Sequence, residues 1–387
     1  MDFALSEEQV MLRDGAERYL TEHYSFDQRR KLLDRGGGFS ESHWRQFADL
    51  GWLALALPED CGGLGGSLVD VSLILEAMGK FLVVEPFATT TILCAHLIDA
   101  CGDRRLRADL LAAIASGDMR LVLAHGEEGT RYDLAAVSTR ARTSTGQFDS
   151  TGHELSGQFV LSGRKICVWD APSAHQLIVS AAIEGGSGLA LFIVERAAPG
   201  LTFHEYRLID GTQCADVDLQ SVPGTLLLAG PEAAHRLDEA ADRMVLVRVA
   251  EALGIMEQVL DLTAEYLRNR SQFGQPLVRF QALQHRLAEM FVEVQEVRSV
   301  LYRGLAYIEA PEPARRAAVS AAKVVASSAG RIVGGQGIQL HGGVGMTDEY
   351  VVGHYFKRLL AIEKSFGDTD YHLKRLASTY RDSHDQN

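Results

Sequence analysis

The chain has 387 residues, of which 47% are hydrophobic and 23% are charged, and its formal net charge is −13 at pH 7. This length can fill two or three domain cores, and the composition is typical of a soluble globular protein. The acidic balance argues against a nucleic-acid surface and against an anionic membrane surface, because both require a basic face on the protein.

The sequence contains no apolar run long enough to span a bilayer. Its first residues, MDFALSEEQ, are acidic where a secretory signal would be basic, so we expect a cytoplasmic protein. The cysteines are odd in number and form no CxxC pair, which predicts reduced, mostly buried thiols rather than a disulfide framework or a zinc site. They are Cys61, Cys94, Cys101, Cys167 and Cys214.

The first third of the chain has a helical pattern. Ser6 and Gln9 form a capping box, and Ser40 is a second helix start signal. After the glycine-rich loop Pro58–Gly66, further helices are expected at about 68–80, 86–100 and 103–116. We therefore predict an N-terminal all-α domain over residues 1–118.

Near Leu121 the hydrophobic pattern changes from the helical period to alternation. Short β-branched or apolar runs follow, separated by turn residues. The runs are LVLAHG, AAVSTRA, HELSGQFVLSG, HQLIVSAA and GLALFIVE. Several strands at this spacing indicate a small barrel or sandwich, so we predict a middle β domain over residues 119–229.

From about Pro231 the helical period returns. One helix is expected up to Arg270, a second over Arg279–Ile308, and a third over Glu312–Gln339. Helices this long pack as a bundle, which predicts a C-terminal four-helix bundle domain over residues 230–387 that buries apolar faces against other subunits. The glycine run Gly334–Gly345 follows a helix rather than a strand, so it does not fit a dinucleotide-binding Rossmann fingerprint.

The stretch Tyr266–Gln281 combines a basic helix end with a turn. Arg268 and Arg270 close the first long helix, and Gly274 and Pro276 then break the pattern. A guanidinium at such a turn can bind a phosphate. On these residues alone, a basic helix end that complements the helix dipole is the favoured interpretation.

Four segments, in this order, resemble signatures of the acyl-CoA dehydrogenase family. They are LSEEQ near the N-terminus, PEDCGGLGG, RSQFG at Arg270–Gly274 and QLHGGVGM at Gln339–Met346. The resemblance covers nearly the whole chain. It implies an acyl-CoA dehydrogenase-like fold, FAD as cofactor, acyl-CoA substrates, α,β-dehydrogenation with a carboxylate as base, and an electron-transferring flavoprotein as electron acceptor.

In that family the Arg-x-x-Phe-Gly and Gln-x-x-Gly-Gly segments contact the ADP half of an FAD whose flavin ring lies in the neighbouring subunit. By position, Arg270 would contact the pyrophosphate, while Phe273 and Gln281 would line the adenosine end. Gln339, Gly342 and Gly343 would supply close backbone and amide contacts. This agrees with the chemistry of the residues, because a guanidinium and an open backbone suit a pyrophosphate.

The chain departs from the family at the catalytic base. Phe366 and Met244 occupy the two positions at which members carry the catalytic glutamate. Asp368, two residues past the first position, is a candidate base, although a base must come within about 3 Å of the proton it removes; capping or a partner contact is the favoured role. Solvated or capping roles are expected for Glu363 and Asp370.

The flavin side departs as well. Gly126–Asp133 keeps Glu127 and Asp133 of a family motif but loses its threonine and serine, and Cys167–Trp169 replaces a flavin-backing segment. We expect His125, His341 and His354 to be structural, and Arg243 and Arg248 to form ion pairs or interface contacts.

These departures indicate a heteromeric enzyme. The resemblance is closest to the small subunits of bacterial heteromeric acyl-CoA dehydrogenases, such as the pimeloyl-CoA dehydrogenase small subunit and the enzymes of steroid side-chain breakdown. It implies an α2β2 assembly in lipid or steroid catabolism, in which a second acyl-CoA dehydrogenase-like subunit carries the base. Two alternatives remain: a self-sufficient homotetramer that uses Asp368, and a purely structural subunit that stabilises a partner.

Overall fold

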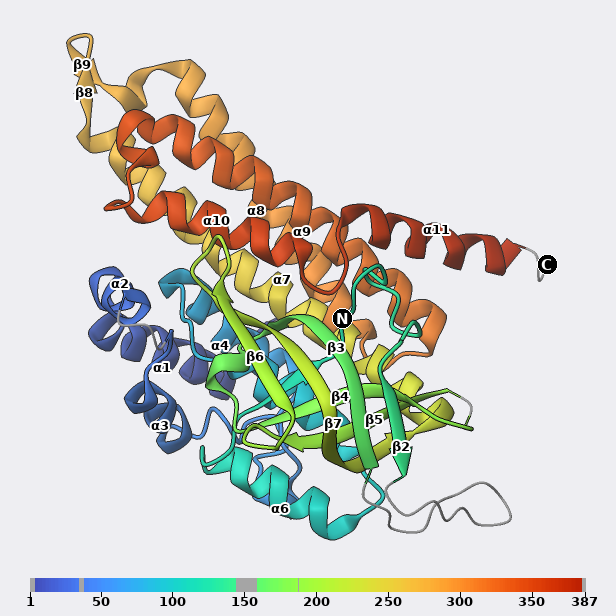
Figure 1. The fold of residues 1–387 in the computed structure, drawn as a ribbon. Helices are drawn as coiled ribbons and strands as arrows, with labels where there is room; N and C mark the ends of the chain where they lie inside the picture. The colour runs from blue at the N-terminus through green and yellow to red at the C-terminus, as the bar shows by residue number, and fades with distance from the viewer. Residues whose placement is uncertain (1–3, 35–37, 144–158, 187, 385–387) are drawn as a thin grey trace. The chain divides into compact units, whose positions relative to one another are not determined.

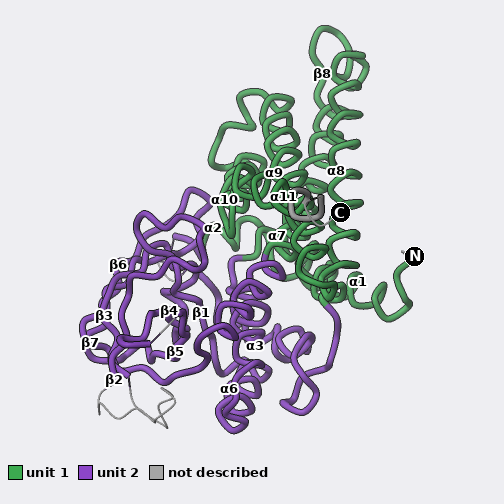
Figure 2. Tube along the Cα trace, turned by 90° about the vertical axis from the view of Figure 1, so that its right-hand side faces the viewer, with its two compact units in different colours: residues 1–31, 68–83, 245–387 green, residues 32–67, 84–244 purple. Residues whose placement is uncertain are grey.

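The described part of the chain forms two compact units (Figures 1 and 2). The computed structural model describes residues 4–34, 38–143, 159–186 and 188–384. The first unit is helical and comprises residues 1–31, 68–83 and 245–387. The second contains the larger β-sheet and comprises residues 32–67 and 84–244.

The first unit is built from long helices, as the helical period predicted. Its helices are α1 (Glu7–His23), α4 (Leu68–Phe81), the part of α7 (Gly230–Asn269) from Val245 on, α8 (Gln281–Tyr307), α9 (Glu312–His341), α10 (Val351–Lys364) and α11 (Thr369–His384). The capping box at the start of α1 is confirmed: the Gln9 N–H donates to the Ser6 hydroxyl, and the Gln9 side chain accepts the Ser6 N–H.

Two glycines allow α4 and α7 to pack with their backbones in contact. A Cβ at Gly254 would lie 1.8 Å from the Glu76 carbonyl oxygen, and a Cβ at Gly79 would lie 2.2 Å from the Glu251 carbonyl oxygen. Neither distance is sterically possible, so only glycine permits this helix crossing.

A buried ion-pair cluster lies beside the same crossing. The Glu251 carboxylate accepts hydrogen bonds from Arg248 at 2.6 Å and from Arg358 at 2.6 and 3.1 Å. Burial raises the pKa of the Glu251 carboxyl, but the two arginines outweigh burial and hold this pKa at about 2. The expected ion-pair role of Arg248 is therefore confirmed.

The second unit begins with short helices. They are α3 (Glu41–Asp49), the 3-10 turn η1 (Glu59–Cys61), the π-helix η2 (Thr89–Cys94), α5 (Ala95–Asp99) and α6 (Arg104–Ala115), while α2 (Phe26–Asp34) crosses the boundary between the units. The helix expected at 86–100 is therefore interrupted by a buried π-helical turn, a local distortion that the hydrophobic pattern does not reveal.

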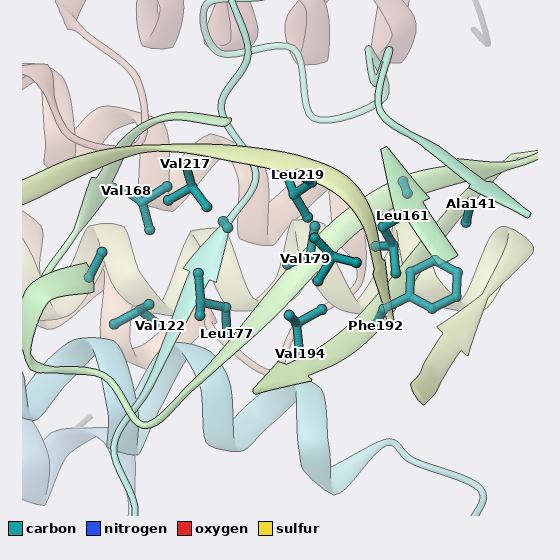
Figure 3. Packing of buried hydrophobic residues seen from close by; sticks show 14 of the residues in the cluster. Val122, Ala141, Leu161, Val168, Leu177, Val179, Phe192, Val194, Val217 and Leu219 are labelled. Atoms are coloured by element: carbon teal, nitrogen blue, oxygen red, sulfur yellow. The ribbon is translucent and has the colours of Figure 1, made fainter. Parts of the chain in front are cut away.

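The strands of the second unit close into a small barrel. They are β1 (Leu121–Ala124), β2 (Arg140–Thr143), β3 (Phe159–Trp169), β4 (Gln176–Ile183), β5 (Leu189–Glu195), β6 (Leu201–Arg207) and β7 (Gln213–Ala229). Pairing runs from β4 through β2, β3, β7 and β5 and back to β4, so of the predicted barrel or sandwich the structure shows the barrel. Side chains such as Leu161, Val179 and Phe192 point toward one another between the strands and form its core (Figure 3).

The predicted strands differ from the barrel in three places. The segment AAVSTRA was expected to be a strand, but only Arg140–Thr143 pairs there. The strand expected over His153–Gly163 begins, within the described residues, at Phe159 and continues to Trp169, while 153–158 lie outside the described residues. The strands β6 and β7 were not predicted, because β6 is largely exposed and β7 contains Pro223 and Gly224, which favour turns.

The fold class is confirmed, with a helical N-terminal part, a middle β-barrel and long C-terminal helices. The boundaries at 118/119 and 229/230 stay predictions, since the two compact units combine segments from different predicted domains. Among the described residues, no helix is both long and apolar enough to cross a membrane.

Candidate functional site

The basic helix end leads into a tight β-hairpin at one end of the helical unit (Figure 1). The strands β8 (Ser271–Gln272) and β9 (Gln275–Pro276) pair across Phe273 and Gly274. Both turn residues have positive φ, 54° and 80°, which is the two-residue type I′ turn. Glycine adopts this conformation freely, whereas Phe273 is held in it with its ring 87% exposed.

The Arg270 guanidinium lies at the base of this hairpin and has no partner among the described residues. The backbone of Arg270 is fixed, because its N–H donates to Tyr266 and its carbonyl accepts the Leu277 N–H. Its side chain is exposed and has no hydrogen bond or ion pair within the described part of the chain. An ordered backbone therefore presents an unneutralised cation to solvent, which is an arrangement suited to an anionic ligand.

The residues after the hairpin continue the same end of the unit. The 3-10 turn η4 (Leu277–Arg279) leads to Gln281, the exposed first residue of α8. The Phe280 ring meets the Phe273 ring edge-on at 6.1 Å. Further along α8, Arg286 donates to Gln336 of α9 at 3.1 Å, which connects this helix to the one carrying the glycine segment.

The glycine segment lies at the C-terminal end of α9 and in the 3-10 turn η5 (Gly342–Met346). The Tyr266 ring, one turn before Arg270, packs on the His341 ring with centroids 4.5 Å apart, so the two predicted segments lie close together. Gln339, Gly342 and Gly343 lie at or near the surface there. A Cβ at either glycine would meet no atom within 4 Å, so their backbones are open to a ligand.

The turn at the predicted base position contains no carboxylate. Phe366 is half-buried and has a φ of 52°, and Gly367 follows with a φ of 108°. A Cβ at Gly367 would lie 2.5 Å from the His372 ring, so the turn requires glycine there. Met244, at the other base position, is 1% exposed on α7 and has no titratable group.

Two buried basic residues fix this turn, and the sequence analysis did not identify either. Lys323 Nζ donates to the carbonyl oxygens of Ile362 and Ser365 at 2.5 and 2.8 Å, and His372 Nε2 lies 3.0 Å from the Phe366 carbonyl oxygen. Burial lowers the pKa of Lys323 to about 7 and that of His372 to about 3. One sequence signal was available, because Lys323 is a lone charge within the small-residue face of α9.

Asp368 begins the final helix. Its carboxylate Oδ1 accepts the Tyr371 N–H at 3.0 Å, and its carbonyl accepts the His372 N–H, which is helix capping. The structure thus agrees with the favoured role, while the alternative role as base stays untested.

The role expected for Glu363 was wrong. Glu363 is 3% exposed rather than solvated, and its Oε2 accepts from Arg331 of α9 at 2.7 Å. Sequence position alone could not show that α9 passes beside this turn and covers the carboxylate.

In the β unit, Glu127 and Lys165 form a buried pair behind the Gly126–Asp133 loop. Lys165 Nζ donates to Glu127 Oε1 at 2.6 Å, and Thr139 adds its N–H and hydroxyl to the same oxygen. Burial raises the pKa of Glu127, but these donors lower it to about 2, while burial lowers the pKa of Lys165 to about 8. Both groups are charged at neutral pH and anchor the loop to the barrel.

The histidines have structural partners, as expected. His125 Nδ1 lies 2.9 Å from the Ser180 hydroxyl, His341 Nδ1 lies 2.7 Å from the Gly337 carbonyl, and His354 Nε2 lies 2.9 Å from the Asp348 carbonyl. In the portion of the chain that the structure describes, no cluster of His, Cys, Asp or Glu could hold a metal ion.

Comparison with known proteins shows which family the chain belongs to. Residues 6–118 match the acyl-CoA dehydrogenase N-terminal domain, and residues 238–380 match the acyl-CoA dehydrogenase C-terminal domain. The acyl-CoA dehydrogenase FadE27 of Mycobacterium tuberculosis is 31% identical over 355 residues, which cover 87% of this chain and 87% of FadE27. The chain belongs to the acyl-CoA dehydrogenase family. Members of this family are FAD-dependent oxidoreductases that act on CH–CH bonds of acyl-CoA.

Solved structures of acyl-CoA dehydrogenases share the fold over almost the whole chain. A variant of the steroid acyl-CoA dehydrogenase Tcur3481–Tcur3483 has a TM-score of 0.86 at 30% identity and covers 98% of this chain and 99% of its own. The ChsE4–ChsE5 complex from Mycobacterium tuberculosis has a TM-score of 0.85 at 27% identity, with coverage of 98% and 99%.

The residues of the helical unit fit the ADP half of the FAD that the family uses. The Arg270 guanidinium has no competing anion among the described residues, and the backbone at Gly342 and Gly343 is open. A pyrophosphate requires both features. The assignment of individual residues to FAD stays a prediction.

Proposed function

We propose that this chain is the subunit of a heteromeric, FAD-dependent acyl-CoA dehydrogenase that lacks the catalytic glutamate. In an α2β2 assembly it donates contacts to the ADP half of an FAD, and its partner, a second acyl-CoA dehydrogenase-like chain, carries the base. The observation that carries the proposal is a contrast within one helical unit. The backbone of Arg270 is fixed and its guanidinium has no neutralising partner among the described residues, while the base turn presents Phe366 and is fixed by Lys323.

Each residue of the donated site has a distinct role. Arg270 binds the pyrophosphate through charge-assisted hydrogen bonds, and Phe273 and Gln281 contact the adenosine end. Gln339, Gly342 and Gly343 supply amide and backbone contacts. When bound, FAD supplies the two-electron acceptor for α,β-dehydrogenation of the acyl-CoA. The Phe366 turn itself has no carboxylate, and Asp368 after it caps the final helix, so in this proposal the partner supplies the group that accepts the substrate α-proton.

The solved relatives support a paired assembly. The ChsE4–ChsE5 structure is a complex of two named chains, and the Tcur3481–Tcur3483 enzyme also carries a double name and is described as a steroid acyl-CoA dehydrogenase. We therefore extend the proposal to a bulky CoA thioester as substrate, with steroid side-chain and dicarboxylic thioesters as the first candidates. An electron-transferring flavoprotein as acceptor and a cytoplasmic location are parts of the same proposal.

The test is to express the chain alone and together with an acyl-CoA dehydrogenase-like chain that keeps the glutamate before Gly-Thr. The expected result is a colourless or insoluble lone chain and a yellow pair with about one flavin per heterodimer, active on a CoA thioester. A yellow, active lone chain would instead support a homotetramer with Asp368 as base. A partner that is fully flavinylated and active by itself would support a purely structural role for this chain.

A further inference from the structure

Two cysteine thiols face each other across neighbouring strands of the barrel. Cys167 lies on β3 and Cys214 on β7, which pair in antiparallel register with Trp169 opposite Cys214. The Cys214 thiol points at the Cys167 sulfur, with the two Sγ atoms 3.6 Å apart. A disulfide bond is about 2.0 Å long, so the two sulfurs must approach by roughly 1.6 Å for the bond to form.

The pair lies at an irregularity of the sheet. The β3–β7 register shifts between Lys165 and Val168, and Cys167 lies within this bulge with a φ of 51°. Its backbone N–H donates to Asp216 Oδ1 at 3.0 Å, and the Tyr206 hydroxyl donates to the same oxygen at 2.9 Å. The backbone is therefore held in a conformation that turns the Cys167 side chain toward Cys214 and solvent.

The two thiols differ in a way that suits attack followed by resolution. Cys167 is exposed, whereas Cys214 is fully buried. The hydrogen bond from the Cys214 thiol lowers the pKa of Cys167 to about 7, although neighbouring atoms partly shield the sulfur from water and oppose this shift. The same bond raises the pKa of Cys214. A reactive, accessible thiolate next to a protonated second thiol is the usual arrangement of an oxidation-sensitive cysteine pair.

The other cysteines do not share this environment. Cys61, Cys94 and Cys101 are buried, and burial raises the pKa of each. Selective oxidation is therefore expected at the Cys167–Cys214 pair, and the three other cysteines serve as internal controls.

We propose that Cys167 and Cys214 form an oxidation site that a hydroperoxide converts to an intramolecular disulfide. The Cys167 thiolate attacks a peroxide oxygen and the O–O bond breaks. The products are a Cys167 sulfenic acid and an alkoxide or hydroxide, which takes up the proton that the Cys167 thiol had released to solvent and becomes an alcohol or water. The Cys214 sulfur then attacks the Cys167 sulfur. The S–S bond forms, the S–O bond breaks, and the hydroxyl leaves as water with the Cys214 proton. Two thiols are oxidised, one peroxide is reduced, and a dithiol reductant restores the pair.

This inference does not depend on the proposed function. The disulfide would link β3 to β7 beside the bulge, where Cys167 N–H already holds Asp216. Oxidation therefore fixes the local strand register and removes the exposed thiol.

The experiment uses the full chain, reduced and freed of reductant, treated with stoichiometric hydrogen peroxide at pH 7 and then alkylated with N-ethylmaleimide. The expected result is a chain mass lower by two hydrogens before alkylation, two fewer alkylated thiols when the chain is unfolded for alkylation, and a cross-linked proteolytic fragment joining Cys167 to Cys214. Dithiothreitol should restore both thiols. Because this mapping is done on the unsubstituted chain, it does not depend on the folding of any variant.

Substituted chains separate the two roles. Cys214→Ala should trap the Cys167 sulfenic acid, detected with dimedone. It should also slow alkylation of Cys167 at pH 7 about tenfold, because the hydrogen-bond donor is removed and the pKa of Cys167 returns toward about 8.5. Cys101→Ser is the matched control and should leave the cross-link unchanged. Peroxide oxidation of Cys167 beyond the sulfenic acid while Cys214 stays alkylatable, or a cross-link elsewhere, would overturn the proposal.

Discussion

Replacing Arg270 by alanine removes the cation on which the proposed FAD contact depends. The Arg270 guanidinium is exposed and unpaired among the described residues, so its removal breaks no contact within this chain. A hydrogen bond from a charged donor contributes about 1.5 to 3 kcal/mol. Its loss should weaken FAD binding by the co-expressed pair about ten- to a hundredfold.

The same variant should leave the fold unchanged. A substitution at an exposed position without partners changes stability by at most about 0.5 kcal/mol. The apparent melting temperature of the flavin-free chain should therefore be the same for Arg270→Ala and the unsubstituted protein. A large loss of stability would show that Arg270 acts within this chain.

The assay is flavin retention by the purified pair, measured by absorbance and by titration of the flavin-free pair with FAD. Arg268→Ala is the matched control, since Arg268 is an exposed arginine on the same helix end without an observed partner in the described residues. Arg270→Lys should retain only part of the affinity, because lysine lacks the planar fork of donors. Unchanged FAD affinity in Arg270→Ala, or an equal loss in Arg268→Ala, would refute the reasoning.

Three further substitutions test the helical unit. Asp368→Ala removes a helix cap and should destabilise the chain by about 1 kcal/mol, which lowers its melting temperature, whereas Asp368→Asn should not. Each variant, co-expressed with the partner, should keep its turnover within about twofold of the unsubstituted pair. A much larger loss of turnover would identify Asp368 as a base. The pKa of Glu251 is about 2, below the ordinary 4.5, so the unfolded chain takes up the proton first as the pH falls. Its contribution, about 3 kcal/mol, is present above about pH 4.5 and is lost toward about pH 2. The unsubstituted chain and Glu251→Gln should therefore differ less in melting temperature at about pH 3 than at about pH 5. The same difference at both pH values would contradict this. Gly254→Ala should destabilise by about 1 to 3 kcal/mol or more through overpacking, whereas the control Gly335→Ala, which meets no atom within 4 Å, should be neutral or stabilising.

Local patterns predicted the helices well, because each is determined by residues near one another in the sequence. The capping box at Ser6, the helix end at Arg270 and the start of α9 at Glu312 all follow from short-range hydrogen bonding and the helical period. Strands β6 and β7 were missed because β6 is largely exposed and β7 contains Pro223 and Gly224, so their strand character is not visible in the hydrophobic pattern.

The sequence by itself determined the family and the chemistry that the chain lacks. The absence of a glutamate at Phe366 and Met244 is visible in the letters alone, as is the arginine at position 270. These are statements about which functional groups exist, and they require no coordinates.

Only the tertiary structure decided which groups are free, buried or paired. It showed that Arg270 is unneutralised among the described residues, that Lys323 from α9 fixes the Phe366 turn, that Arg331 covers Glu363, and that Cys214 lies beside Cys167. The contacts made by Lys323, Arg331 and Cys214 each join residues far apart in the chain. Their proximity results from the packing of whole helices and strands, which no local pattern specifies.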